Sequence, residues 1–197
     1  MNIEYFENWS KYYQLQLDGV SFEPNARRRV AMGLLHLSLE HHQSILNLAK
    51  CNLFGSSFAL LRCQFEALLR GVWFLRCATN TDIKKFIDGK NLKLNVNALI
   101  SDVETTKGYK NGALKRYKTG KWKAMNDYTH GGLFQVSTRT QGDEVIGRNL
   151  LEHSLWILTE SSKLSLLSIL DFCLIIEQPK LSGTLSTKYF EIMEKLP

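Results

Sequence analysis

The stretch from residue 56 to residue 78 carries apolar side chains around almost its whole helical circumference. Four of them follow the spacing of one helical face, namely Leu61, Phe65, Leu68 and Val72. The other faces are also largely apolar, being covered by Leu60, Cys63, Ala67, Leu69, Trp73 and Phe74. A helix that is apolar on every side must be enclosed by other elements. This stretch therefore predicts a central helix inside a protein built from several helices.

Apolar residues recur at helical spacing along most of the remaining chain. The segments are residues 2–17, 26–50, 81–106, 112–130, 143–177 and 186–196. Alternating β-branched runs and hairpin turns, which mark strands, are absent. We therefore predict an all-α fold, a helical bundle in which residues 26–50, 56–78 and 143–177 form three long helices and the other segments form shorter ones.

Local signals mark the predicted ends of these helices. Ser56 or Ser57 can cap the N-terminus of the central helix. Pro179 should end the third long helix, because proline cannot continue a helix. The segment between Gly131 and Gly142 is expected to be a flexible connection.

The length of 197 residues suits one domain that buries a core without disulfides or metal ions. A hydrophobic content of 44% and a charged fraction of 22% argue against a disordered chain and against a membrane protein. We expect a single helical domain over residues 1–197, in which residues 1–18 dock as an N-terminal helix, residues 26–177 form the bundle and residues 186–196 form a terminal helix.

The cysteines and the start of the chain bear on the cellular compartment. Four scattered cysteines lack the paired spacing of zinc or redox sites, and we read them as reduced core residues: Cys51, Cys63, Cys77 and Cys173. The start lacks a basic segment followed by an apolar one, and no run approaches the roughly 18 uncharged apolar residues of a membrane span. We therefore expect a cytoplasmic protein with no membrane partner.

No cofactor or metal is predicted. A glycine-rich phosphate loop and a nucleophile elbow are both absent. His36, His41 and His42 lack carboxylate or cysteine partners at fixed spacing, so we read them as surface or packed histidines.

A ladder of charges interrupts the apolar central helix. Arg62, Glu66 and Arg70 are spaced four residues apart and so lie along one face. Charges on an apolar helix must be paired, or must face a cavity or an interface, because an isolated buried charge is costly. The ladder indicates either a functional site or a purely structural Arg-Glu-Arg clamp.

The stretch from Met125 to Gly132 resembles a site at the end of a helix. Asn126 and His130 lie four residues apart on one face, and Gly131 with Gly132 can take the left-handed backbone that ends a helix. A histidine exposed there is suited to acid, base or phosphate chemistry. The alternative is that His130 only caps the helix.

The segment from residue 107 to residue 123 is basic and contains no acidic residue, against a net charge of +6 for the whole chain. Its cations are interleaved with Tyr109, Tyr117 and Trp122, a mixture that suits a phosphate backbone with stacked bases. The predicted RNA-binding residues are Lys115, Arg116, Lys118, Lys121, Trp122 and Lys123. A solvated lysine-rich face is the alternative, and no motif for sequence-specific DNA recognition is present.

The order of these features resembles the HEPN superfamily of bacterial helical bundles, over residues 26–177. That superfamily has an Arg, usually followed by a polar residue, and a His four to six positions further on. Asn126 to Gly131 match this motif, but Met125 stands in place of the Arg. A second match, Arg148 to His153, has the literal spacing, but it lacks the His-Gly ending and the loop that follows.

The resemblance implies a metal-independent cut of RNA at a site shared across a dimer. His acts in proton transfer or phosphate orientation, and Arg stabilises the phosphorane charge. The predicted catalytic residues here are His130, Asn126, Arg62 and Glu66, with Arg62 or Arg70 supplying the charge that Met125 cannot supply.

Two functions follow as expectations. The first is an RNA-targeting ribonuclease toxin or phage-defence effector that acts as a homodimer or with a partner protein. The second is a non-catalytic helical interaction module, such as an antitoxin, immunity or accessory subunit, that acts through the surface around Arg62, Glu66 and Arg70.

Overall fold

The computed structural model describes residues 3–146 and 151–196, with residues 151–153 described by their backbone alone. The helices are α1 (Glu4–Leu17), α2 (Ala26–Lys50), α3 (Phe54–Arg76), α4 (Asn80–Ile87), α5 (Val96–Val103), α6 (Ala113–Thr129), α7 (Leu133–Ser137), α8 (Leu151–Ile175) and α9 (Pro179–Met193). Two short antiparallel strands, β1 (Thr140–Gln141) and β2 (Glu144–Val145), form a hairpin. The predicted all-α fold is confirmed.

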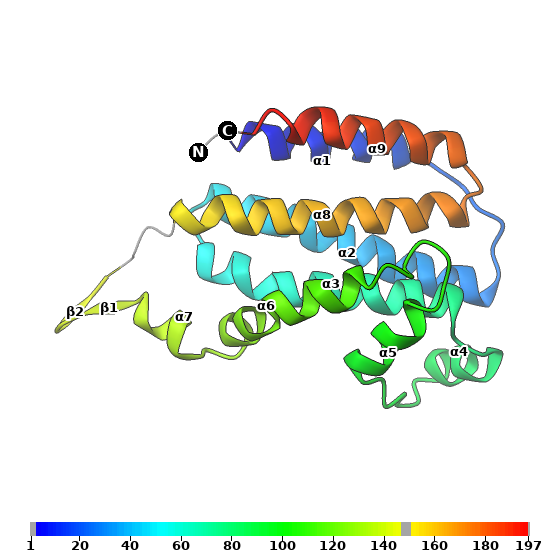
Figure 1. Cartoon of the computed structure of the whole chain (residues 1–197), viewed down its shortest axis with the longest axis horizontal. Helices are drawn as coiled ribbons and strands as arrows, with labels where there is room; N and C mark the ends of the chain where they lie inside the picture. The colour runs from blue at the N-terminus through cyan, green and yellow to red at the C-terminus, as the bar shows by residue number, and fades with distance from the viewer. Residues whose placement is uncertain (1–2, 147–150, 197) are drawn as a thin grey trace.

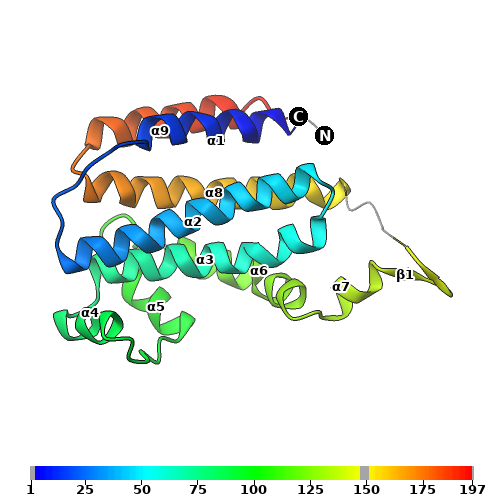
Figure 2. The same ribbon diagram turned by 180° about the vertical axis from the view of Figure 1, so that it is seen from behind.

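The three long helices α2, α3 and α8 pack against one another in the middle of the molecule (Figure 1). On one side α1 and α9 form a further layer next to α8, and on the other side α6 runs along α3 (Figures 1 and 2). The short helices α4 and α5 lie beside one end of α3, whereas α7 and the hairpin extend from the opposite end (Figure 1). No described helix is long and apolar enough to cross a membrane.

The central position of α3 follows from its apolar circumference. Phe65, Leu68 and Leu69 are each fully buried, although they lie on different faces of the helix. Helix α1 docks through the same effect, since Phe6 and Trp9 are fully buried. The prediction of an enclosed central helix is therefore confirmed.

Two predicted helix starts are wrong for identifiable reasons. Helix α3 begins at Phe54, and Ser57 does not cap it, because the Ser57 hydroxyl donates to the carbonyl of Ile45 at 3.1 Å. Helix α9 begins at Pro179 rather than near residue 186, since the missing N–H of a proline is no loss in a first helical turn.

The connection after α6 is more ordered than predicted. It contains α7 and the two-stranded hairpin, which turns at Gly142 with a φ of +57°. Strands of two residues are too short to show an alternating pattern in the sequence. The cysteines also need a correction: all four are free, but only Cys173 is buried, while Cys51 and Cys63 are exposed.

Candidate functional site

Helix α3 carries the predicted charge ladder as a connected set of ion pairs. Arg62 Nε lies 2.8 Å from Glu66 Oε1, and Arg70 Nη2 lies 3.5 Å from Glu66 Oε2. The side chains of Arg62 and Glu66 are 22% and 23% exposed, so the pair is half-buried but open to solvent on one side. The carboxylate thereby fixes the position of the Arg62 guanidinium.

The end of α6 brings a histidine to this pair. The helix ends at Thr129 with His130 as its C-cap, and Gly131 follows with the predicted left-handed backbone, at a φ of +66°. The hydroxyl of Thr129 donates to the carbonyl of Ala59 at 3.2 Å, which ties this end of α6 to α3. His130 is consequently exposed beside α3.

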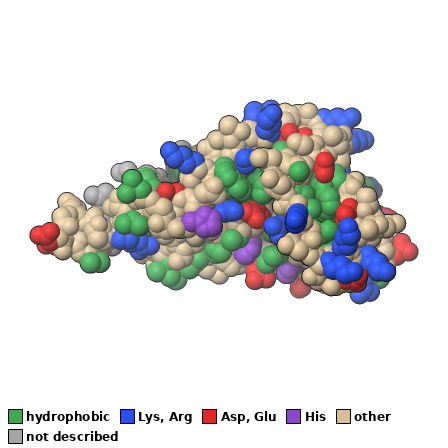
Figure 3. All heavy atoms as spheres, turned by 90° about the horizontal axis from the view of Figure 1, so that it is seen from below, with side chains coloured by type: hydrophobic (Ala, Val, Ile, Leu, Met, Phe, Trp, Pro, Cys, Tyr) green, Lys and Arg blue, Asp and Glu red, His purple; other side chains and the backbone are tan. Residues whose placement is uncertain are grey.

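Arg62 and His130 are in direct contact, through Nη1 of the guanidinium and Nε2 of the ring. A guanidinium only donates hydrogen bonds, so Nε2 must accept and the ring proton must lie on Nδ1. Three of the residues predicted to be catalytic, Arg62, Glu66 and His130, therefore lie together, and their catalytic role stays a prediction. Figure 3 shows histidine, basic and acidic side chains gathered on one face of the molecule.

Trp122 completes the surroundings of Arg62. Arg62 Cζ lies 4.9 Å from the centroid of the indole ring, and Lys118 Nζ lies 5.2 Å from it. Contacts between a cation and an aromatic face are favourable. The indole predicted to stack on RNA bases is therefore already in contact with two cations.

Met125 and Asn126, the two motif positions before His130, have different surroundings. Met125 is 1% exposed and belongs to the core, so an Arg at this position would point into the bundle. Asn126 is half-buried, and its Oδ1 has no hydrogen-bond partner among the described residues. The cation of the site comes from Arg62 on the neighbouring helix.

The basic face of α6 is smaller than the sequence suggested. Lys121 Nζ lies 3.3 Å from the buried Glu160 Oε1, and Arg116 Nη1 donates to the carbonyl of Asn111 at 2.5 Å. Lys115 and Lys123 are exposed. RNA contact by this helix stays a prediction, and the structure leaves fewer of its cations unengaged than the sequence implied.

The two tyrosines of the basic segment face inward. Tyr109 is buried, and its hydroxyl donates to Asp171 Oδ2 at 2.6 Å. The ring of Tyr117 stacks on Phe65 with centroids 5.3 Å apart. These two rings therefore belong to the packing of the bundle rather than to a platform for bases.

The buried ion pair between Arg76 and Asp171 was not predicted from the sequence. Asp171 is 1% exposed, and its Oδ1 accepts from Nε of Arg76 at 2.8 Å. Burial raises the pKa of the Asp171 carboxyl, while Arg76 and the Tyr109 hydroxyl oppose that shift. The signal in the sequence was a single carboxylate inside the apolar run of the last long helix. Asp171, Arg76 and Tyr109 therefore join three parts of the chain: helix α8, helix α3 and the connection between α5 and α6.

The remaining predictions concern residues away from Arg62 and His130. His42 is fully buried and packed, with Nδ1 2.8 Å from Ser161 Oγ. In the described part of the chain, no three His, Cys, Asp or Glu side chains are arranged to hold a metal ion. The second motif match cannot be placed, because Arg148 and the side chain of His153 lie outside the described residues.

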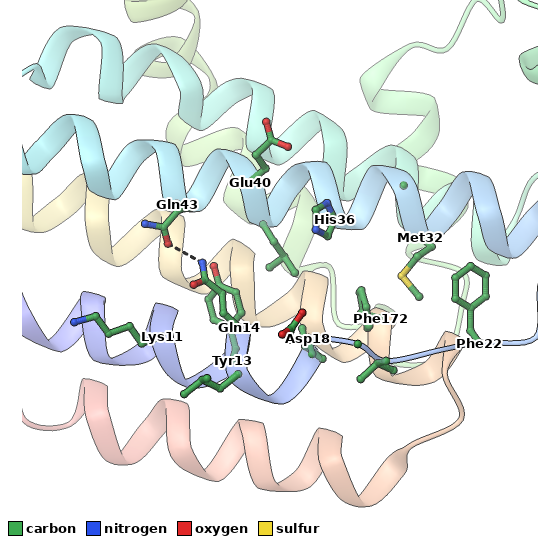
Figure 4. Close-up of a pocket in the computed structure, with 16 residues that line it drawn as sticks. Lys11, Tyr13, Gln14, Asp18, Phe22, Met32, His36, Glu40, Gln43 and Phe172 are labelled. Carbon is green, nitrogen blue, oxygen red and sulfur yellow. Dashed lines mark hydrogen bonds between the residues drawn. The ribbon is translucent and has the colours of Figure 1, made fainter.

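A large groove lies elsewhere, between α1, α2 and the connection that joins them (Figure 4). It has a volume of about 1040 Å³, and two of its polar residues, Gln14 and Gln43, hydrogen-bond to each other at 2.9 Å. It is not lined by Arg62, Glu66 or His130. We place the candidate site at Arg62 and His130, because ionisable groups converge there.

The fold and the site define an all-α bundle with an exposed Arg-Glu-His cluster between two helices. The chain belongs to the family of unknown function DUF6988, whose model matches residues 35–197. This range includes Arg62, Glu66 and His130 and leaves out α1. No curated protein and no solved structure matches the chain.

Proposed function

We propose that this protein is a HEPN-like, RNA-targeting ribonuclease that cuts RNA at Arg62 and His130 without a metal ion. The contact between the Arg62 guanidinium and Nε2 of His130 is the observation that carries the proposal. Phosphodiester cleavage needs a fixed cation for the phosphate charge and a group that moves a proton. The pair supplies both, and the HEPN resemblance adds the biological class of a toxin or phage-defence effector.

The reaction starts from His130 with its ring proton on Nδ1, which is the state that the contact between Nε2 and Arg62 requires. An entering phosphate takes over the Arg62 guanidinium, which frees Nε2 of His130 to accept the proton of the substrate 2′-hydroxyl. The O2′–phosphorus bond then forms while the bond to the 5′-oxygen breaks. The imidazolium returns the proton to this leaving oxygen, which gives a 2′,3′-cyclic phosphate and a 5′-hydroxyl. Glu66 acts as a positioning residue, because it holds Arg62 through Nε.

The test is cleavage of labelled RNA by purified protein. His130→Ala should lower the rate by about a hundredfold or more with the fold intact, and a chelator should leave the rate unchanged. His36→Ala is the matched control, since His36 lies on α2 and lines the groove away from the cluster. RNA with a 2′-deoxy group at the cut site should resist cleavage.

Three outcomes would contradict the proposal: equal rates for His130→Ala and the wild type, loss of activity in the chelator, or cleavage of the 2′-deoxy substrate. Arg148→Ala and His153→Ala test the other motif match. If they abolish cleavage and His130→Ala does not, that second match is the active one.

An interaction module is the second candidate, and the segment after α6 favours it. In this segment Leu133 is 82% exposed, Val136 is 54% exposed and Val145 is 89% exposed. Several exposed apolar side chains on one short segment are typical of a protein-binding surface. If the protein shows no ribonuclease activity, and Leu133→Ser and Val145→Ser convert a dimer into a monomer in light scattering, this second function is supported.

A further inference from the structure

A second groove lies between the first turns of α6, the middle of α8 and the end of α9. Its volume is about 570 Å³, which is within the range of pockets that hold small organic molecules. Much of its wall is apolar, with Leu114, Leu164, Leu167, Phe190, Met193 and Leu196 among the lining residues. None of the proposed catalytic residues lines it.

Tyr117 supplies an unused donor to this groove. The residue lines the groove, and its hydroxyl is buried without a hydrogen-bond partner among the described residues. Burial and the nearby Glu160 carboxylate raise the pKa of the Tyr117 phenol well above its ordinary value, so the hydroxyl keeps its proton. A buried donor without an acceptor is an unfavourable arrangement that a ligand can relieve.

Glu160 does not line the groove, but its carboxylate lies close enough to the Tyr117 hydroxyl to act on it electrostatically. Its Oε1 is shared by Lys163 at 2.9 Å and Lys121 at 3.3 Å, whereas Oε2 is buried with no partner among the described residues. Lys163 and the adjacent Thr159 both line the groove. The Tyr117 hydroxyl and Glu160 Oε2 therefore lack partners in one region, and they do not bond to each other.

We propose that this groove binds a small neutral molecule with an apolar body and a hydroxyl group, whose oxygen accepts a hydrogen bond from the Tyr117 hydroxyl. A hydroxyl oxygen accepts a hydrogen bond without carrying a charge. An anionic head would lie beside the Glu160 carboxylate, and a cationic head would compete with the two lysines already bound to it. A neutral head avoids both costs, and the apolar body covers the apolar wall.

The experiment compares three probes that share a linear hydrocarbon body and differ in their head group: octan-1-ol, octanoate and octylammonium. Calorimetric titration of the full chain should show saturable binding of octan-1-ol that is about tenfold tighter than binding of either charged probe. Tyr117→Phe keeps the ring stacked on Phe65 and removes only the donor, so it should weaken octan-1-ol binding by about tenfold.

Tyr128→Phe is the matched control, because the Tyr128 hydroxyl is also buried without a partner but does not line this groove. It should leave octan-1-ol binding unchanged. Leu167→Trp should block the groove, and melting curves of all variants report whether they are folded. The proposal is overturned if octanoate or octylammonium binds as tightly as octan-1-ol, if Tyr117→Phe binds octan-1-ol like the wild type, or if no probe shows saturable binding.

Discussion

His42 should make the folded protein sensitive to acid. The ring is fully buried, with Nδ1 2.8 Å from Ser161 Oγ and Nε2 without a partner among the described residues. The Ser161 hydroxyl donates to Gln64 Oε1 at 2.6 Å, so Nδ1 must carry the proton that bonds Ser161. A second proton would have to sit on Nε2, where no acceptor stabilises the charge.

The size of the effect follows from the pKa. Burial lowers the pKa of His42 from 6.5 to about 3. Between these two pH values the unfolded chain binds more protons than the folded chain. The contribution of His42 to the free energy of unfolding is therefore complete above pH 6.5 and falls as the pH decreases towards 3. Each pH unit costs about 1.4 kcal/mol, which gives a loss of about 2 kcal/mol between pH 6.5 and pH 5.0.

Urea unfolding at pH 7.5 and pH 5.0 measures this loss. His42→Gln stays neutral and can still donate to Ser161, so its free energy of unfolding should gain about 2 kcal/mol relative to the wild type at the lower pH. His36→Gln, which changes another histidine of α2, should follow the wild type. Parallel pH dependence in the wild type and His42→Gln would refute the reasoning.

Two further predictions concern stability alone. Arg76→Ala leaves Asp171 as a buried charge without its cation, and urea unfolding should show a loss of about 3–5 kcal/mol, in contrast to a loss below about 1 kcal/mol for the more exposed Arg70→Ala. Gly131→Ala should lower the melting temperature by the equivalent of about 1 kcal/mol, because φ is +66° there; Gly33→Ala, in a helix with open space around it, should raise it.

The helices were predictable because burial repeats along each of them. Residues 26–50 were predicted with the observed bounds, since Asn25 caps the helix by accepting from the backbone N–H of Arg28 and a positive-φ Asn52 follows its end. The start of α3 was not predictable in the same way. Ser57 is a good capping residue by type, but its hydroxyl bonds α2, a contact that depends on the tertiary fold.

The candidate site was predictable in part for the same reason. The spacing of Arg62 and Glu66, and the helix end at His130, are local features, and the structure joins them. Which cations of the basic segment are free to bind a partner could not be predicted from local sequence. Whether Lys121 faces solvent or a carboxylate depends on Glu160, which lies on α8 and far along the chain.

Lys121 and Lys123 therefore give the last prediction. Lys121 Nζ lies 3.3 Å from Glu160 Oε1 and 5.4 Å from the centroid of the Trp156 ring, whereas Lys123 is exposed. If α6 binds RNA, Lys123→Ala should reduce the slope of log K against log salt by about 0.7–0.9 without changing the melting temperature. Lys121→Ala should lower the melting temperature, because it removes one of two cations from a buried carboxylate, and should leave the slope unchanged. The reverse assignment of the two effects would show that Lys121 leaves Glu160 to contact phosphate.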